Sequence, residues 1–198
     1  MLLSGVWLSA IAQPHGGVDQ YYCLKKAKSL SFVPLIYFET GDHWYGECRY
    51  NYEADETVSV YAGRTFKNTK AFAYSFSPMI GIAGGKFDGY SLALNSNFEY
   101  KKYSLSSQCQ YVISTKDRNL NFAYIWTDAC YKVFPHISIG ISVQQTKTFC
   151  SNMTEGGIMI QASFRKWTVP LYFFNPPGKE RYFMLGINYE WQQKQSRK

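Results

Sequence analysis

The chain has 198 residues, of which 18% are aromatic and 18% charged, and its formal net charge is +7. The charged fraction lies below the roughly 25% of ordinary soluble domains. The Lys and Arg residues are spread over many turns and both ends, with no basic helix or dense stripe, so we expect no nucleic-acid partner. No apolar run approaches the ~20 residues of a membrane-spanning helix, which excludes a helical membrane protein.

The N-terminal segment 2–12 reads LLSGVWLSAIA and ends in Ala-Ile-Ala, an A-x-A pattern typical of signal-peptide cleavage. This apolar run is too short to cross a membrane as a helix. We therefore predict a signal peptide over 1–12, one β-barrel domain over 13–191 and a polar tail over 192–198. The alternative for the N-terminal segment is a buried strand.

Alternation of apolar and polar residues with a period of two, typical of β-strands, recurs from about residue 30 to the end of the chain. It is clearest where Ile137, Ile139, Ile141 and Val143 alternate with small or polar residues. The alternating stretches are 31–39, 43–53, 57–66, 72–83, 90–100, 103–113, 120–131, 136–144, 157–165, 167–174 and 181–191. Most are longer than the five or six residues of soluble strands and match the nine to eleven residues that cross a bilayer.

The polar column of these strands is unusual because it consists mainly of Ser, Asn, Gln, Gly and Ala. A soluble calycin-like barrel would present many Lys and Glu residues to water. Small and amide side chains instead suit the crowded interior of a membrane barrel. Aromatic residues near the predicted strand ends fit the girdles at lipid–water boundaries; they are Tyr52, Phe66, Tyr100, Tyr103, Phe164, Trp167, Tyr189 and Trp191.

The last alternating stretch, RYFMLGINYEW, carries Phe183, Leu185, Ile187 and Tyr189 on one face and an aromatic residue near its end. It resembles the C-terminal insertion signal of bacterial outer-membrane β-barrel proteins, although here seven polar residues, QQKQSRK, follow it. The architectural resemblance covers roughly residues 20–191. It implies an all-β, single antiparallel up-and-down transmembrane barrel, integral to a Gram-negative outer membrane. It also implies contact with outer-membrane lipid and insertion by the barrel-assembly machinery.

Connection lengths support this topology, because single-chain bacterial barrels usually have an even number of strands, short periplasmic turns and longer outer loops. With a periplasmic C-terminus, the longer connections 114–119, 146–156 and 175–181 lie outside. The short connections 41–42, 101–102, 132–135 and 166–167 then lie in the periplasm. An even count requires one more strand within 18–28. We predict about twelve strands, with ten as the fallback.

Three prolines interrupt predicted strands, namely Pro34, Pro78 and Pro170. Proline has no N–H group to donate to a strand ladder. We therefore predict bulges or local gaps in the ladders at these positions.

Charged and amide residues of the polar columns form the candidate functional site. We predict a lumenal polar network of His43, Glu47, Arg49, Glu53, Asn95, Asn97, Glu99, Arg165, Asn188 and Glu190. The network could act as a selectivity ring or solute site, or as an internal plug of paired charges. The expected function is therefore passive, either a small-solute pore or an envelope structural protein.

Two alternatives remain. His136 and Ser138 share a face at a spacing that resembles outer-membrane lipid A deacylases, but no acid stands at a suitable spacing to orient the His. We therefore predict no enzyme activity and no catalytic residue. The other alternative is a soluble calycin-like binder of an apolar ligand. The five cysteines form no C-x-x-C pair and the three histidines are scattered, so we expect neither a metal nor a cofactor.

Overall fold

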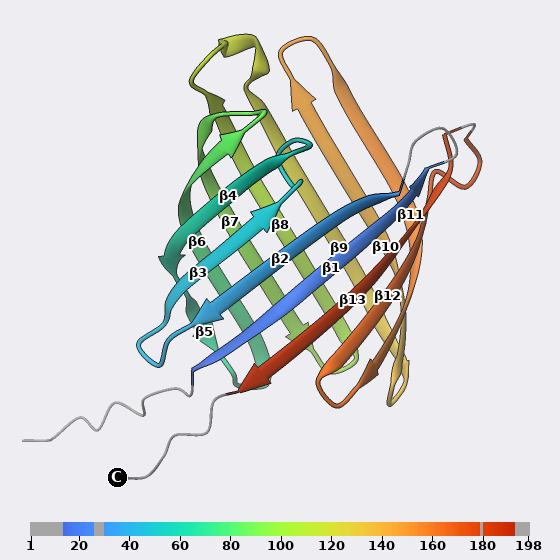
Figure 1. Ribbon diagram of the computed structural model, residues 1–198. Coiled ribbons are helices and arrows are strands. Elements are labelled where there is room, and N and C mark those ends of the chain that lie inside the picture. The colour runs from blue at the N-terminus through green and yellow to red at the C-terminus, as the bar shows by residue number, and fades with distance from the viewer. Residues whose placement is uncertain (1–13, 26–29, 179, 193–198) are drawn as a thin grey trace, which may run out of the picture.

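The computed structural model describes residues 14–25, 30–178 and 180–192, most of them in antiparallel strands (Figure 1). The strands are β1 (His15–Lys25), β2 (Ser31–Glu39), β3 (Trp44–Tyr50), β4 (Thr57–Arg64), β5 (Phe66–Asn68), β6 (Phe72–Gly85), β7 (Gly89–Tyr100), β8 (Tyr103–Ser114), β9 (Phe122–Phe134), β10 (Ile137–Thr148), β11 (Asn152–Phe164), β12 (Trp167–Phe174) and β13 (Tyr182–Gln192). A single 3-10 turn, η1 (Arg118–Leu120), precedes β9. No helix among the described residues is long and apolar enough to cross a membrane. The predicted signal peptide, and all of the predicted tail except Gln192, lie outside the described residues.

The sheet closes on itself, and each strand pairs with its neighbours in chain order. β1 pairs with β13 along its whole length, from His15 opposite Gln192 to Lys25 opposite Tyr182. Both β4 and β5 pair with β6 in one continuous register, so they are two parts of a single barrel strand. The barrel therefore has twelve strands, as predicted. The additional strand expected within 18–28 is β1, which begins earlier, at His15.

The two ends of the barrel differ in their connections (Figure 1). The turn end carries the start of β1, the end of β13 and the connections 40–43, 69–71, 101–102, 135–136 and 165–166. The loop end carries 51–56, 86–88, 115–121, 149–151 and 175–181. The predicted long loop over 146–156 is wrong, because β10 and β11 extend as a hairpin to the short connection 149–151. These strands pair as far as Lys147 opposite Asn152, which satisfies backbone groups that a loop would leave open.

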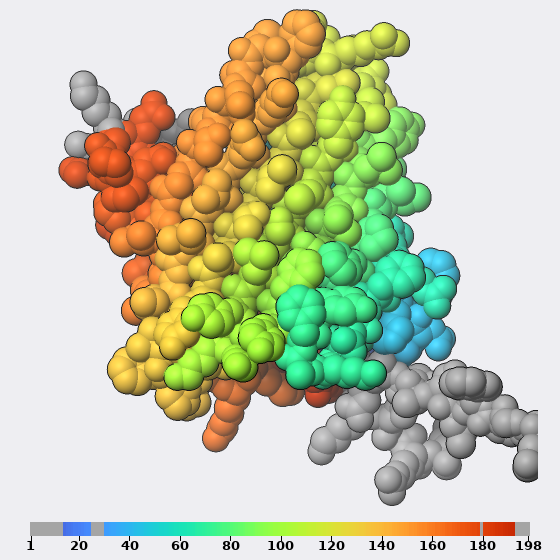
Figure 2. Space-filling model, turned by 180° about the vertical axis from the view of Figure 1, so that it is seen from behind, coloured from blue at the N-terminus to red at the C-terminus, as the bar shows by residue number. Residues whose placement is uncertain are grey.

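Figure 2 shows the outer surface of the barrel over β6 to β11. The side chains on the outer surface are mainly apolar. Ile80 is 67% exposed and Ile141 is 59% exposed, whereas inward-facing Ser91 and Ser142 are buried. The same division holds in the final strand, where Phe183 is exposed outside and Met184 is buried inside. A closed sheet with an apolar outer surface and no free edge meets the requirements of a bilayer. The predicted division of the strands into an apolar outer face and a polar inner face is therefore confirmed, and contact of the outer face with lipid stays a prediction.

The three strand prolines coincide with gaps in the hydrogen-bonded ladders, as predicted. Pairing of β2 with β3 begins at Leu35, directly after Pro34. Pairing of β12 with β13 is interrupted between Thr168 and Leu171, where Pro170 lies. Pro78 lies opposite the break between β4 and β5, since Met79 still pairs with β4 and Phe76 with β5.

Gly186 occupies the gap that Pro170 creates in the seam between β12 and β13. A Cβ atom at this position would lie 2.6 Å from Cγ of Pro170 and 3.0 Å from Cε1 of Tyr21. The absence of a side chain therefore allows the proline ring and the adjacent wall of the barrel to pack closely.

We expect Gly186→Val to impair assembly, because its side chain would clash with the rigid ring of Pro170. The assembled fraction, measured by heat-modifiable migration on a gel, should fall severalfold. Gly156→Val is the matched control, since a Cβ there meets nothing within 4 Å. Equal assembly of the two variants would contradict this reading of the β12–β13 seam.

Candidate functional site: the polar network in the lumen

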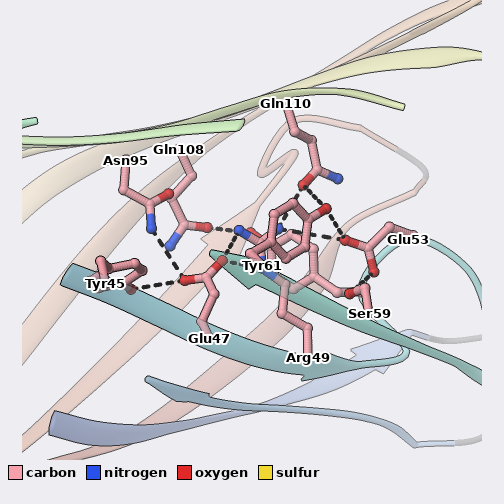
Figure 3. A network of polar contacts seen from close by, with 10 residues as sticks. Tyr45, Glu47, Arg49, Glu53, Ser59, Tyr61, Asn95, Gln108 and Gln110 are labelled. Carbon is pink, nitrogen blue, oxygen red and sulfur yellow. Dashed lines mark hydrogen bonds and ion pairs between the residues drawn. The ribbon is translucent and has the colours of Figure 1, made fainter. Parts of the chain in front are cut away.

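Arg49 on β3 is the centre of a charged network inside the barrel (Figure 3). Arg49 is only 1% exposed. The Nε atom donates to Oε1 of Glu47 at 2.6 Å, and the same carboxylate forms an ion pair with the guanidinium. Nη1 donates to Oε1 of Gln110 on β8 at 2.6 Å and lies 3.6 Å from Oε1 of Glu53. Arg49 thus links β3 to a strand across the lumen and to the connection that follows its own strand.

Two tyrosine rings enclose the Arg49 guanidinium. Its central carbon lies 4.4 Å from the ring centroid of Tyr52 and 4.1 Å from that of Tyr61. The Tyr61 hydroxyl donates to Oε1 of Glu53 at 2.7 Å, and the Tyr52 hydroxyl donates to Gln108 on β8. The buried cation is therefore compensated by two carboxylates and by two aromatic faces.

The β3–β4 connection, residues 51–56, folds into the lumen because Asn51 leaves the strand conformation, with φ of 58°. Its side-chain Oδ1 accepts from the Glu56 N–H at 2.7 Å, and its own N–H donates to the Thr57 carbonyl at 2.9 Å. The period-two alternation ends here, so Tyr52 points inward like Glu53. The prediction that Tyr52 is a membrane-interface residue is wrong for this reason.

Four other residues of the predicted network line one cavity of the lumen, namely Asn95, Asn97, Asn188 and Glu190. Asn95 donates to Glu47 at 3.3 Å, and Asn97 donates to Ser75 at 3.3 Å. His43 contacts Glu39, which lines the same cavity, at 2.7 Å.

Two other predicted residues are not part of the lumenal polar network. Arg165 adopts a left-handed conformation in the exposed turn between β11 and β12, with φ of 55°. Glu99 is exposed beside the 101–102 turn, and its side chain has no hydrogen bond or ion pair among the described residues. The prediction is wrong for both residues, because the alternation assigns a residue to one face of the sheet but does not give its depth along the lumen.

Sequence reasoning missed two further clusters. Glu39, 3% exposed, contacts His43 and Lys67 at 2.7 Å each and His15 at 3.7 Å. Asp128 on β9 accepts from Trp126, Ser142 and Tyr172 at 2.9, 2.6 and 3.0 Å. A lone Asp among small polar residues was the available signal for Asp128. The Glu39 cluster joins β1, β2 and β5 with the turn after β2, and no spacing in the sequence indicates that.

The described residues enclose two cavities in the lumen that meet at Tyr21 and Trp126, which line both of them. The cavity near the turn end has a volume of about 380 Å³ and is lined by Glu47 and Gln108, among others. The cavity nearer the loop end has a volume of about 230 Å³ and is lined by Tyr52 and Glu53. The Arg49 network therefore lies between the two cavities.

The seven other predicted interface aromatics lie on the outer face near the turn end. Those that are exposed are Phe66, Tyr100, Tyr103, Phe164 and Trp167. Tyr189 and Trp191 are half-buried, and the Tyr189 ring packs against Trp167 at 4.6 Å between centroids. Their role at a lipid–water boundary stays a prediction.

His136 and Ser138 do not form a catalytic arrangement. The ring of His136 stacks on Phe164, and its Nδ1 lies 3.1 Å from the Ser163 carbonyl oxygen. A register shift separates Ile137 from Ser138. Among the described residues, His136 has no carboxylate partner that could orient it.

We expect Arg49→Met to destabilise the barrel, because it leaves Glu47 and Glu53 as uncompensated carboxylates in a buried site. Breaking a buried ion pair in this way costs roughly 3–5 kcal/mol. The measurement is thermal unfolding in detergent, followed by circular dichroism. Lys116→Met is the control, since it breaks only an exposed pair with Asp88 and should leave the unfolding temperature nearly unchanged. Equal shifts in the two variants would mean that the Arg49 network contributes no special stability.

No family model matches the chain, and no curated protein is similar to it in sequence. Solved porin structures resemble it in fold. The KdgM porin has a TM-score of 0.64 at 12% identity, covering 87% of this chain and 98% of the porin. A KdgM complex with disordered oligogalacturonate gives a TM-score of 0.65 at 12% identity, with the same coverage. The NanC porin gives 0.60 at 8% identity, covering 89% and 100%. The closed twelve-strand barrel and its apolar outer surface agree with this likeness: the chain has the β-barrel fold of these porins.

Proposed function

We propose that this barrel is a narrow passive channel for small polar solutes across the outer membrane. The observation that carries the proposal is the pair of lumenal cavities of about 380 and 230 Å³ that meet at Tyr21 and Trp126. A barrel filled only for stability would not need two cavities along its lumen. Asn97 and Glu190, which line the larger cavity, are exposed, so this cavity is accessible from the turn end.

The Arg49 network forms the constriction of the proposed channel. Tyr52 belongs to the β3–β4 connection, residues 51–56, and not to a strand of the barrel wall. Its ring covers the guanidinium, and its hydroxyl reaches Gln108 across the lumen. Tyr52 therefore narrows the route between the two cavities without belonging to a strand ladder.

The expected partners follow from this proposal. Outer-membrane lipid surrounds the apolar outer face, the barrel-assembly machinery inserts the chain, and a small solute occupies the lumen. The soluble calycin-like alternative conflicts with the apolar outer surface, which water would not cover favourably.

A second candidate is an envelope structural protein, which the burial of the Arg49 network favours. Arg49, Tyr61 and Ser59 are each no more than 1% exposed, so this part of the lumen is tightly filled. In that case the cavities would hold only trapped water. Conductance separates the two candidates.

We expect the purified protein to give discrete ohmic steps in a planar bilayer, and Tyr52→Ala to enlarge them by about twofold or more, because pore width limits conduction. Tyr90→Ala is the matched control, since Tyr90 is 60% exposed on the outer face and should not affect conductance. Absence of steps in the native protein and in Tyr52→Ala, at high protein load, would favour the structural role.

A further inference from the structure

The charge of the larger, turn-end cavity is opposite in sign to that of the whole chain. The chain carries a net +7. The carboxylates that line this cavity are Asp19, Glu39, Glu47, Asp128 and Glu190, whereas the basic side chains that line it are Lys67 and His15. The excess positive charge of the protein therefore lies elsewhere, and the lumen at the turn end is acidic.

Three of these carboxylates have no cationic partner among the described residues. Glu39 is paired with Lys67, and Glu47 with Arg49. By contrast, Asp19 and Glu190 form no ion pair, and Asp128 is bound only by neutral donors. β1 and β13 are paired, with Asp19 opposite Asn188, so Asp19 and Glu190 lie on adjacent strands. Their charges add to one field in the cavity.

A second, independent feature points to the same class of solute. The amide oxygens of Asn95 and Asn188 are buried and have no hydrogen-bond partner, and both residues line this cavity. Rings of Tyr37, Tyr45 and Trp126 also line it. Amide oxygens accept or coordinate but do not donate, and aromatic faces attract cations. Both features are suited to positive charge and neither to an anion.

We propose that the turn-end cavity admits cations, both inorganic and small organic ones such as alkylammonium ions, and rejects anions. The passage of cations through the barrel rests on the proposed channel function, which this inference deepens. The entry of cations into the cavity rests only on the lining residues described above. Fields in clefts lined by one sign of charge raise the local concentration of counter-ions by about 10-fold or more.

Trp126 provides a direct probe, because it lines the cavity. In a variant with Phe at the four other Trp positions, 7, 44, 167 and 191, its fluorescence reports on quenchers that enter the lumen. The measurement uses folded protein in detergent at pH 8. We expect caesium to quench Trp126 about fivefold or more better than iodide. Acrylamide, a neutral quencher, should also quench and measures access.

Asp19→Asn combined with Glu190→Gln should at least halve the ratio of caesium to iodide quenching. Asp55→Asn is the matched control, since Asp55 is exposed at the loop end and lines neither lumenal cavity. Equal quenching by the two ions, stronger quenching by iodide, or no quenching by acrylamide would overturn the proposal. If the Phe variant does not fold, the reversal potential of the native protein in a salt gradient decides, and chloride selectivity overturns the proposal.

The two hypotheses fail separately. Caesium-selective quenching without any bilayer current would contradict the channel function but support the entry of cations into the cavity. Bilayer current that favours chloride would support a channel and overturn the cation preference. Current that favours potassium, together with selective quenching by caesium, supports both.

Discussion

Hydrocarbon offers no hydrogen-bond partner to a peptide group, and the whole architecture depends on this constraint. A sheet in a bilayer must close, because an open edge would leave a row of unsatisfied N–H and C=O groups. The seam between β1 and β13 achieves this closure with eleven residue pairs, and it joins the first described strand to the last. The gaps at Pro78 and Pro170 are tolerated because each interrupts only one ladder while the pairing continues on both sides of it, whereas at Pro34 the β2–β3 ladder begins after the proline.

Closure also turns one face of every strand toward an enclosed lumen. Side chains from twelve strands converge on a lumen too narrow to be filled with bulk water. Charged groups there must be compensated, and Arg49 is compensated by Glu47, Glu53 and two tyrosine rings. Asp19 and Glu190 form no ion pair among the described residues, and both line the turn-end cavity.

The strand pattern was predictable to a large extent because it depends on local alternation. The ranges of most strands, the outward-facing side, the count of twelve and the proline gaps all follow from residues close in sequence. Two of the errors have a common cause. Tyr52 turned inward because Asn51 adopts a left-handed conformation, and Arg165 left the lumen because it forms a turn. A period-two pattern carries no information about where such a break occurs.

The candidate site was predictable only in composition. The sequence by itself determined which face of each strand is apolar and that Glu47, Arg49 and Asn95 face the lumen, since facing is set by the parity of a residue within its strand. Tertiary structure alone decided that Arg49 meets Gln110, 61 residues away, that His15 and Lys67 meet Glu39, and that Trp126 lies between two cavities. The physical reason is that contacts across the lumen depend on the closure and tilt of the barrel, which every ladder sets together and no single strand encodes.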